Sequence, residues 1–175
     1  MNIMKTASSL LAALTLLAYS AFASPPSSEQ VIADAKTKAS AEQKAIFVHF
    51  GASWCGWCKR LDAFLDRKDI KPVFEKYFVP VKLVVQEKEK DKALENPGAE
   101  AFMTKLGGPS GLPYSAFLDS KGDLIANSKN SVGNNIGFPA QPDEIDCFVK
   151  MMKKAAPKMS EQDLKIIETA LSQKT

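Results

Sequence analysis

The sequence is poor in cysteine and in histidine. Its 175 residues include three cysteines, Cys55, Cys58 and Cys147, and one histidine, His49. Three cysteines are far too few for a disulfide-rich scaffold, and the number is odd. The fold must therefore be stabilised by its hydrophobic core, and we expect the cysteines to serve chemistry rather than structure.

An excess of charge of one sign is also absent. The chain has 23 Lys and Arg against 20 Asp and Glu, which gives a formal net charge of +3. Its basic residues form no block long enough for a nucleic-acid-binding patch, so we expect no nucleic-acid partner. Hydrophobic residues make up 45% of the sequence, enough for a real core, and the length fits one domain.

Long hydrophobic runs are lacking except near the N-terminus. There, Lys5 is followed by an apolar run over residues 10–18 and by Ala21-Phe22-Ala23, a small-x-small cleavage site. This order is typical of a secretory signal peptide. We therefore expect residues 1–23 to be removed and residues 24–175 to form a single domain.

A membrane anchor is the alternative interpretation of the same segment. The run from Leu10 to Ala23 contains Thr15 and Ser20, and it is shorter than the roughly 20 residues that a spanning helix needs. We therefore expect a periplasmic or secreted protein with no membrane anchor after cleavage. Export places the cysteines in an oxidising compartment, which permits disulfides.

Along the rest of the chain, hydrophobic periodicity alternates between strand and helix. The continuous apolar run at 45–50 ends at Gly51 and suits a strand buried on both faces. A second apolar run at 78–85 and a hairpin pattern at 114–126 predict the other strands. Helical spacing predicts helices over about 28–39, 55–68, 70–77, 99–106, 143–156 and 160–171.

These elements predict one α/β domain, with a central mixed β-sheet flanked by helices and a core at residues 45–156. An extra N-terminal helix precedes this core, where Ser27 or Ser28 provides the N-cap. An extra C-terminal helix follows it, capped by Ser160.

The Cys55-Gly56-Trp57-Cys58 motif directly follows the first predicted strand. Cys55 then stands at the start of a helix, where free backbone N–H groups and the helix dipole favour a thiolate. Such cysteines have pKa values lowered to roughly 3.5–7.5. Cys58 lies less than one helical turn further on, close enough to form a ring with Cys55. The motif predicts thiol–disulfide exchange, with Cys55 as the nucleophile and Cys58 as the resolving thiol.

Residues 47–59, FVHFGASWCGWCK, closely resemble the active-site segment of thioredoxins, in which a strand leads into W-C-x-x-C-K and a helix. Gly111-Leu112-Pro113 resembles the G-x-P motif of the same superfamily, and Lys82-Leu83 resembles its K-L pair. On these motifs the chain is similar to exported, periplasmic-type members of the thioredoxin superfamily. The resemblance covers roughly residues 45–156 and implies a thioredoxin-like fold.

The resemblance also implies a substrate groove beside the two cysteines. This groove would be formed by Trp54, Gly56, Trp57, Leu112 and Pro113, with Pro113 in the cis configuration and facing the cysteines. An extended segment of a client protein would pair with the backbone beside this proline, as in strand addition.

The sequence departs from thioredoxin within and around these motifs. Trp57 replaces the usual proline between the cysteines, which alters the helix start and the environment of the thiolate. The redox potential of thioredoxin therefore does not transfer to this chain. Residues 86–100 and 127–142 are also longer than a minimal thioredoxin needs, and we expect loops over 86–98 and 127–142.

His49 stands where thioredoxins have a buried acid. One interpretation is a proton relay, in which His49 accepts the proton of the Cys58 thiol near neutral pH. The other is a buried histidine with a satisfied hydrogen bond. Lys82 is expected beside His49, where its charge would favour the neutral imidazole.

Cys147 also has two interpretations, a third redox or dimer-linking thiol and a small residue under the last helix. A zinc site that combines the three cysteines with His49 is not expected, because His49 belongs to a strand and Cys147 to a distant helix. We therefore expect no metal and no cofactor beyond a redox-active Cys55–Cys58 disulfide.

The leading hypothesis is an exported thiol–disulfide oxidoreductase that reduces or isomerises disulfides of exported proteins. It would exchange electrons with a membrane-bound donor or acceptor, and the same steps in reverse would oxidise a dithiol. The alternative is a non-catalytic metallochaperone or client-binding module that uses Cys55 and Cys58 to bind copper(I) or protein, since two soft thiolates suit that ion.

Overall fold

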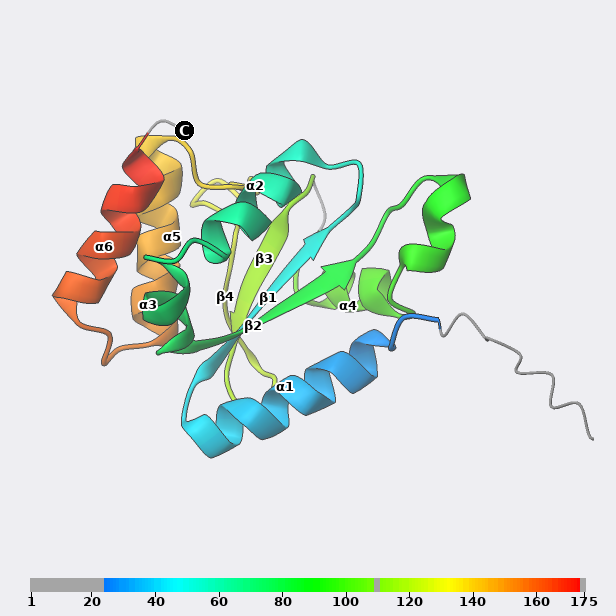
Figure 1. Ribbon diagram of the computed structural model, residues 1–175, viewed down its shortest axis with the longest axis horizontal. Helices are drawn as coiled ribbons and strands as arrows, with labels where there is room; N and C mark the ends of the chain where they lie inside the picture. Colours follow the sequence, from blue (N-terminus) through cyan, green and yellow to red (C-terminus); the bar gives the residue numbers. More distant parts are fainter. Residues whose placement is uncertain (1–23, 109–110, 174–175) are drawn as a thin grey trace, which may run out of the picture.

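The computed structural model describes residues 24–108 and 111–173 (Figure 1). The expected signal peptide, residues 1–23, lies outside the described residues. Along the chain the elements are α1 (Ser28–Glu42), β1 (Ala45–Gly51), α2 (Gly56–Leu65), α3 (Lys71–Glu75), β2 (Phe78–Val84), the 3-10 helix η1 (Glu89–Leu94), α4 (Ala99–Lys105), β3 (Tyr114–Leu118), β4 (Leu124–Asn127), α5 (Pro142–Ala155) and α6 (Glu161–Ser172).

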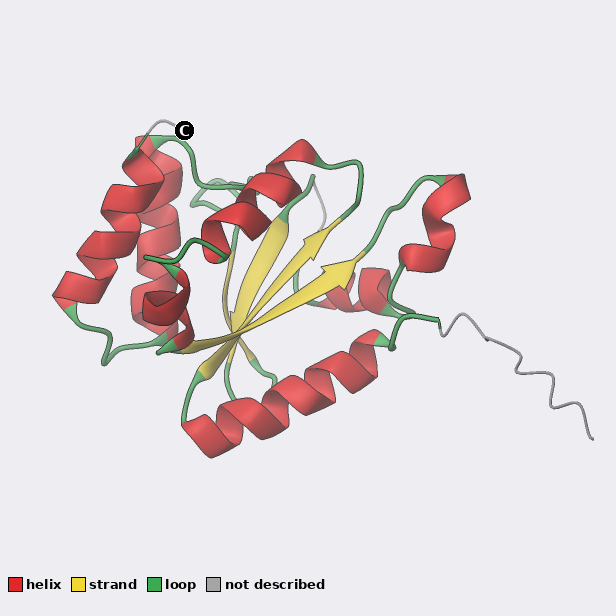
Figure 2. Cartoon of the chain, in the orientation of Figure 1, coloured by secondary structure: helices red, strands yellow, loops and turns green. Residues whose placement is uncertain are grey.

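The strands form a four-stranded sheet in the order β2-β1-β3-β4. β1 runs parallel to β2 and antiparallel to β3, and β3 and β4 form an antiparallel hairpin. Figure 2 shows this sheet between the helices. The predicted α/β fold with a mixed sheet flanked by helices is therefore confirmed.

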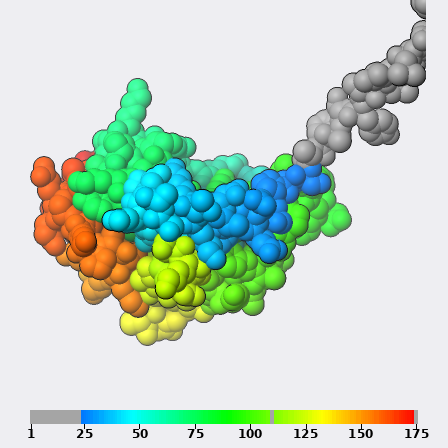
Figure 3. All heavy atoms as spheres, turned by 90° about the horizontal axis from the view of Figure 1, so that it is seen from below, coloured from blue at the N-terminus to red at the C-terminus, as the bar shows by residue number. Residues whose placement is uncertain are grey.

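β1 divides the hydrophobic core in two, because successive side chains of a strand point to opposite faces. Ile46, Val48 and Phe50 belong to a core with α1 and α4. Phe47 belongs to the core on the other face, with α2, α3, α5 and α6. Figure 1 shows α1 on one side of the sheet and α2 on the other, and Figure 3, which looks onto α1, shows that helix lying across its face of the molecule.

The helix boundaries follow local signals in the sequence. The Ser27 side chain accepts a hydrogen bond from the Gln30 N–H at 3.2 Å, and Ser160 caps α6 in the same way. α2 ends at Leu65, earlier than the predicted limit near residue 68. The chain turns there because the N–H groups of two later residues both bond to the Arg67 carbonyl.

The extra C-terminal helix is fixed to the core by polar and apolar contacts. The Tyr77 hydroxyl donates to the Asp163 carboxylate at 2.6 Å, and the Lys76 ammonium lies 2.8 Å from it. These partners hold the pKa of Asp163 well below its usual range, at about 2. The apolar face of α6 completes the core that contains Phe47.

The packing of Phe117 predicts a large effect on stability. Its ring is fully buried, with ring centroids 4.9 Å from Phe47 and 4.8 Å from Phe78. We expect Phe117→Ala to lower the free energy of unfolding by about 3–5 kcal/mol, measured by urea denaturation with an unchanged slope. Val132→Ala, at a side chain 76% exposed, is the control and should change it by less than about 0.5 kcal/mol. Equal effects of the two substitutions would contradict this packing.

Candidate active site

Cys55 and Cys58 form a disulfide at the start of α2, with Cα atoms 5.3 Å apart. Cys55 is the N-cap of this helix, and its Sγ accepts the Cys58 N–H at 3.1 Å. Both cysteines are buried. In the reduced protein the same N–H group and the helix dipole would stabilise negative charge on Cys55, which is the condition for a nucleophilic thiolate.

The glycine that ends β1 makes room for the disulfide. A Cβ atom at Gly51 would lie 3.1 Å from the Cβ and 3.2 Å from the Sγ of Cys58. Any larger residue at Gly51 would therefore push against the second cysteine. Ala52 and the two cysteines form a small buried cluster, against which Leu112 packs.

The loop before Cys55 is tied to the chain that follows β2. The indole N–H of Trp54 donates to the Gln86 carbonyl at 2.8 Å. The Glu87 carboxylate is buried and accepts hydrogen bonds from both the backbone N–H and the hydroxyl of Ser53. The longer 86–98 segment thus supports the active-site loop, a role that its charged sequence did not indicate.

Two indole rings flank the disulfide at the surface, Trp54 at 49% and Trp57 at 52% exposure. Trp57 stacks on Phe138 with ring centroids 6.1 Å apart. The Arg60 guanidinium lies 5.3 Å from the Trp57 centroid and 4.8 Å from the Phe138 centroid, so that it contacts both rings by cation–π attraction. These contacts fix the exposed ring of Trp57.

The Leu112–Pro113 peptide is cis, as the resemblance implies. A pocket beside it is lined by Trp57 and Leu112, two of the predicted groove residues, and by the segment 136–138. Pro113 adjoins this segment, because a side chain at Gly137 would meet its Cδ at 3.9 Å. Sequence reasoning missed 136–138, since it lies in a long loop that carries no motif.

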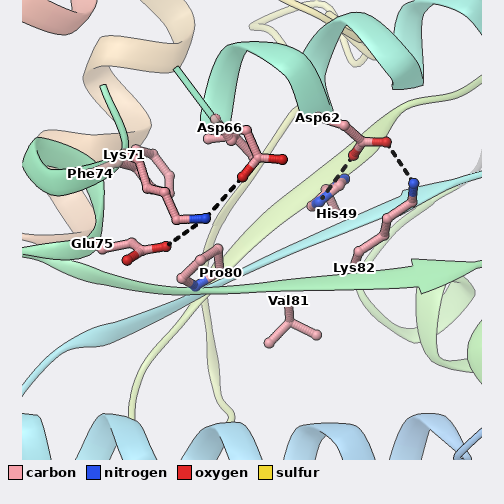
Figure 4. A pocket seen from close by; sticks show the side chains of 10 residues that line it. His49, Asp62, Asp66, Lys71, Phe74, Glu75, Pro80, Val81 and Lys82 are labelled. Carbon is pink, nitrogen blue, oxygen red and sulfur yellow. Dashed lines mark hydrogen bonds and ion pairs between the residues drawn. The ribbon is translucent and has the colours of Figure 1, made fainter. Parts of the chain in front are cut away.

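His49 lies on the face of β1 that α2 covers, opposite Lys82 of β2 in the sheet register. Its Nε2 is 3.7 Å from an oxygen of Asp62, and the other oxygen of that carboxylate is 2.6 Å from the Lys82 ammonium (Figure 4). The structure thus brings His49 and Lys82 together through Asp62. Sequence reasoning missed Asp62, although its place one helical turn after Cys58 was a signal.

The environment of His49 favours the neutral imidazole. The side chain is 4% exposed, and its Nδ1 has no hydrogen-bond partner among the described residues. Burial lowers the pKa of His49 to about 4, and the charge of Lys82 acts in the same direction, while Asp62 opposes both. The buried histidine therefore carries no charge at neutral pH, and its Nδ1 makes no hydrogen bond with the described residues.

His49 lines a surface pocket between α2, α3 and β2. Figure 4 shows charged side chains around it, with the Lys71 ammonium 2.9 Å from Asp66 and 3.8 Å from Glu75. The ion pairs of Lys71 with Asp66 and Glu75 thus lie on the α3 side of the pocket, away from the Asp62–Lys82 pair.

Comparison with protein families identifies the family to which this fold belongs. A family profile described as thioredoxin-like matches residues 28–120, just over half of the chain. The chain belongs to this thioredoxin-like family. A thioredoxin-like protein with a Cys-x-x-Cys disulfide at the start of α2 is a thiol–disulfide oxidoreductase.

Solved structures of similar architecture include a disulphide isomerase from Xylella fastidiosa Temecula1, at 20% identity and a TM-score of 0.49, over 90% of this chain and 98% of that one. The exposed lipoprotein thioredoxin Etrx1 from Streptococcus pneumoniae strain TIGR4 has 18% identity and a TM-score of 0.45, over 70% and 88% of the two chains. No curated protein matches the sequence. With TM-scores below 0.5, the family assignment depends on the profile match alone.

Cys147 of this thioredoxin-like protein is a free, partly buried thiol that packs against the core on the α5 side. Burial raises its pKa, and the nearby Asp146 charge adds to that effect.

Within 24–108 and 111–173, no three His, Cys, Asp or Glu side chains are grouped so that they could hold a metal ion. None of the helices in these ranges has the length and apolar character to cross a membrane.

The buried imidazole predicts a pH-dependent stability of the thioredoxin-like domain. His49 has a pKa of about 4 in the folded protein against an ordinary value of 6.5, so the unfolded chain binds the additional proton between these values. Stability therefore falls as the pH is lowered from 7 to 5, by at most about 1.4 kcal/mol per pH unit from this group.

We expect His49→Gln to weaken this loss, measured as the difference between urea midpoints at pH 7 and pH 5. Lys105→Gln, at an exposed residue of α4 on the other face of the sheet, should retain the parent's difference. An identical pH dependence in His49→Gln and the parent would contradict a neutral His49.

Proposed function

We propose that this protein exchanges disulfides with exported proteins, with Cys55 as the nucleophile and Cys58 as the resolving thiol. The observation that carries this proposal is the position of the disulfide, with Cys55 as the N-cap of α2 and its sulfur accepting the Cys58 N–H. This arrangement favours the thiolate on Cys55.

In the reducing direction, the Cys55 thiolate attacks one sulfur of a client disulfide. A mixed disulfide forms between Cys55 and that sulfur, while the other client sulfur leaves as a thiolate and takes up a proton. The Cys58 thiol then loses its proton and attacks the Cys55 sulfur. The first client sulfur to bind Cys55 now leaves as a thiolate. The client has gained two electrons, and Cys55 and Cys58 have lost two electrons in forming their disulfide.

His49 is proposed as the acceptor of the Cys58 proton, with Lys82 helping to keep it neutral beforehand. The support is the neutral, buried imidazole with an unpartnered Nδ1. Its other nitrogen faces Asp62, which follows Cys58 by one turn of α2. Asp62 would stabilise the imidazolium once the proton arrives, as a carboxylate beside a base does.

The client would lie in the groove of Trp54, Gly56, Trp57, Leu112 and Pro113. Two features support this role, the exposed indoles beside the disulfide and the packing of Leu112 against the cysteines. We propose that the clients are exported proteins that carry thiols or disulfides. We also propose that a membrane-bound protein donates electrons to the Cys55–Cys58 pair or accepts electrons from it. The signal-peptide pattern of residues 1–23 supports a periplasmic or secreted location.

A trapping experiment tests the proposed roles of the cysteines. Cys58→Ser leaves the nucleophile without its resolving thiol, so we expect it to accumulate mixed disulfides with client proteins in cells. Cys55→Ser is the matched control and should accumulate none. Non-reducing gels followed by mass spectrometry of the captured chains provide the measurement. No capture by Cys58→Ser, together with stoichiometric copper(I) binding by the parent, would replace this function with the metallochaperone alternative.

The proton relay predicts a changed pH profile of turnover. We expect His49→Leu to slow the resolving step by about tenfold near pH 7, less than a base matched to neutral pH would contribute, because an imidazole with a pKa of about 4 accepts a thiol proton weakly. The measurement is the rate of insulin reduction against pH, with dithiothreitol as the electron source.

Lys71→Gln provides the control for this relay. Lys71 lines the same pocket but contacts Asp66 and Glu75 rather than Asp62, so its profile should match the parent's. An unchanged profile in His49→Leu would rule the relay out and leave the roles of the cysteines intact.

A further inference from the structure

Asn135, in the loop between β4 and α5, contacts the segment that contains the cis proline. Its side-chain N–H₂ group donates to the carbonyl of Gly111 at 2.9 Å and to the carbonyl of Pro113 at 3.0 Å. The two residues on either side of Leu112 are therefore held by one side chain from a different part of the sequence.

The carbonyl oxygen of the same side chain is also fully used. It accepts the Ser128 hydroxyl at 2.7 Å and the Gly137 N–H at 3.2 Å. A primary amide offers two donors and one oxygen with two acceptor positions, so all four are occupied. Ser128 is itself fully buried and accepts the Ser115 N–H of β3, which connects Asn135 to the sheet.

Asn135 thereby joins the two sides of the groove. Through Gly111 and Pro113 it holds the chain beside the cysteines, and through Gly137 it holds the neighbour of Phe138, on which Trp57 stacks. A side chain that bonds both segments sets the distance between them.

The backbone of Leu112 is left without a partner. Its flanking carbonyls bond to Asn135, yet its own N–H and C=O make no hydrogen bond with any described residue. Leu112 is partly exposed and packs against the cysteine cluster. Unpaired main-chain groups at such a position can pair with the backbone of an added strand.

We propose that Asn135 is a positioning residue. By binding the carbonyls of Gly111 and Pro113, it fixes the main chain of 111–113 so that the Leu112 N–H and C=O stay open for the strand addition that the resemblance to thioredoxins implies. This inference rests on the proposed function, since the client must first be joined to Cys55. It predicts that Asn135 contributes to the binding of polypeptide thiols and not to the binding of small thiols, which have no backbone to pair with Leu112.

Thiol exchange at equilibrium separates these two substrate classes. In a Cys58→Ser background, Cys55 is first joined to 2-mercaptoethanol and then titrated with a ten-residue peptide that contains one cysteine. One S–S bond breaks and one forms, and 2-mercaptoethanol leaves as the thiol. The equilibrium constant of this exchange measures the preference for polypeptide.

Two substitutions of Asn135 are compared in this background. Asn135→Asp retains an acceptor for Ser128 and Gly137 but cannot donate to the carbonyls of Gly111 and Pro113. Asn135→Ala removes both the donated and the accepted hydrogen bonds. We expect each to lower the exchange constant by about tenfold, the effect of losing one or two hydrogen bonds. Asn134→Ala is the matched control, since the Asn134 side chain is exposed and bonds to no described residue.

A peptide methylated on the backbone nitrogens that flank its cysteine gives a second test. With Asn135 intact in the Cys58→Ser background, this peptide should already have the lowered exchange constant. The Asn135 variants should then lower it no further. A purely structural role of Asn135 would lower the melting temperature but leave the exchange constant unchanged, and that result would overturn the inference. If the Cys58→Ser protein with Asn135 intact forms a mixed disulfide with neither thiol, the proposed function itself fails.

Discussion

The free N–H groups in the first turn of α2 are the interaction on which the site depends. They exist because β1 ends at Gly51 and the helix begins just after Cys55, so that this cysteine takes the N-cap position. The sheet determines where that helix begins, since β1 is buried on both faces and paired on both edges. A cysteine one turn further along the same helix would meet paired N–H groups and would lack the stabilisation of a thiolate.

The polar residues around His49 are arranged so that the core buries no charged side chain at this position. Burying a charged group is costly, whereas a neutral imidazole needs little compensation. Here the buried position holds His49, and the carboxylate is placed on α2 as Asp62, where it is partly exposed and paired with Lys82. Charge is thus kept at the edge of the core, close enough to respond to a proton on the histidine. An ionised carboxylate at the buried position would carry a desolvation cost that the neutral imidazole avoids.

Local patterns accounted for most of the fold. The continuous apolar run of β1, the serine caps of α1 and α6, and the glycine before the motif are each visible in a few neighbouring residues. The contacts that complete the site are of another kind. Asn135 is one of several asparagines in a long loop, and its four partners come from segments up to 24 residues away. Glu87 likewise resembles any other acid of a charged stretch until the fold brings it under Ser53. The roles of such residues depend on contacts between distant parts of the chain, and no short sequence pattern predicts those contacts.

The placement of the aromatic residues has a practical consequence. The chain contains two tryptophans, and both flank the disulfide with about half of each ring exposed. All of the tryptophan emission of the protein therefore originates beside the reacting sulfurs, with no background from the rest of the fold. The unlabelled protein carries its own optical reporter, in which the arrival of a client or the opening of the disulfide is observed as a change in intrinsic fluorescence.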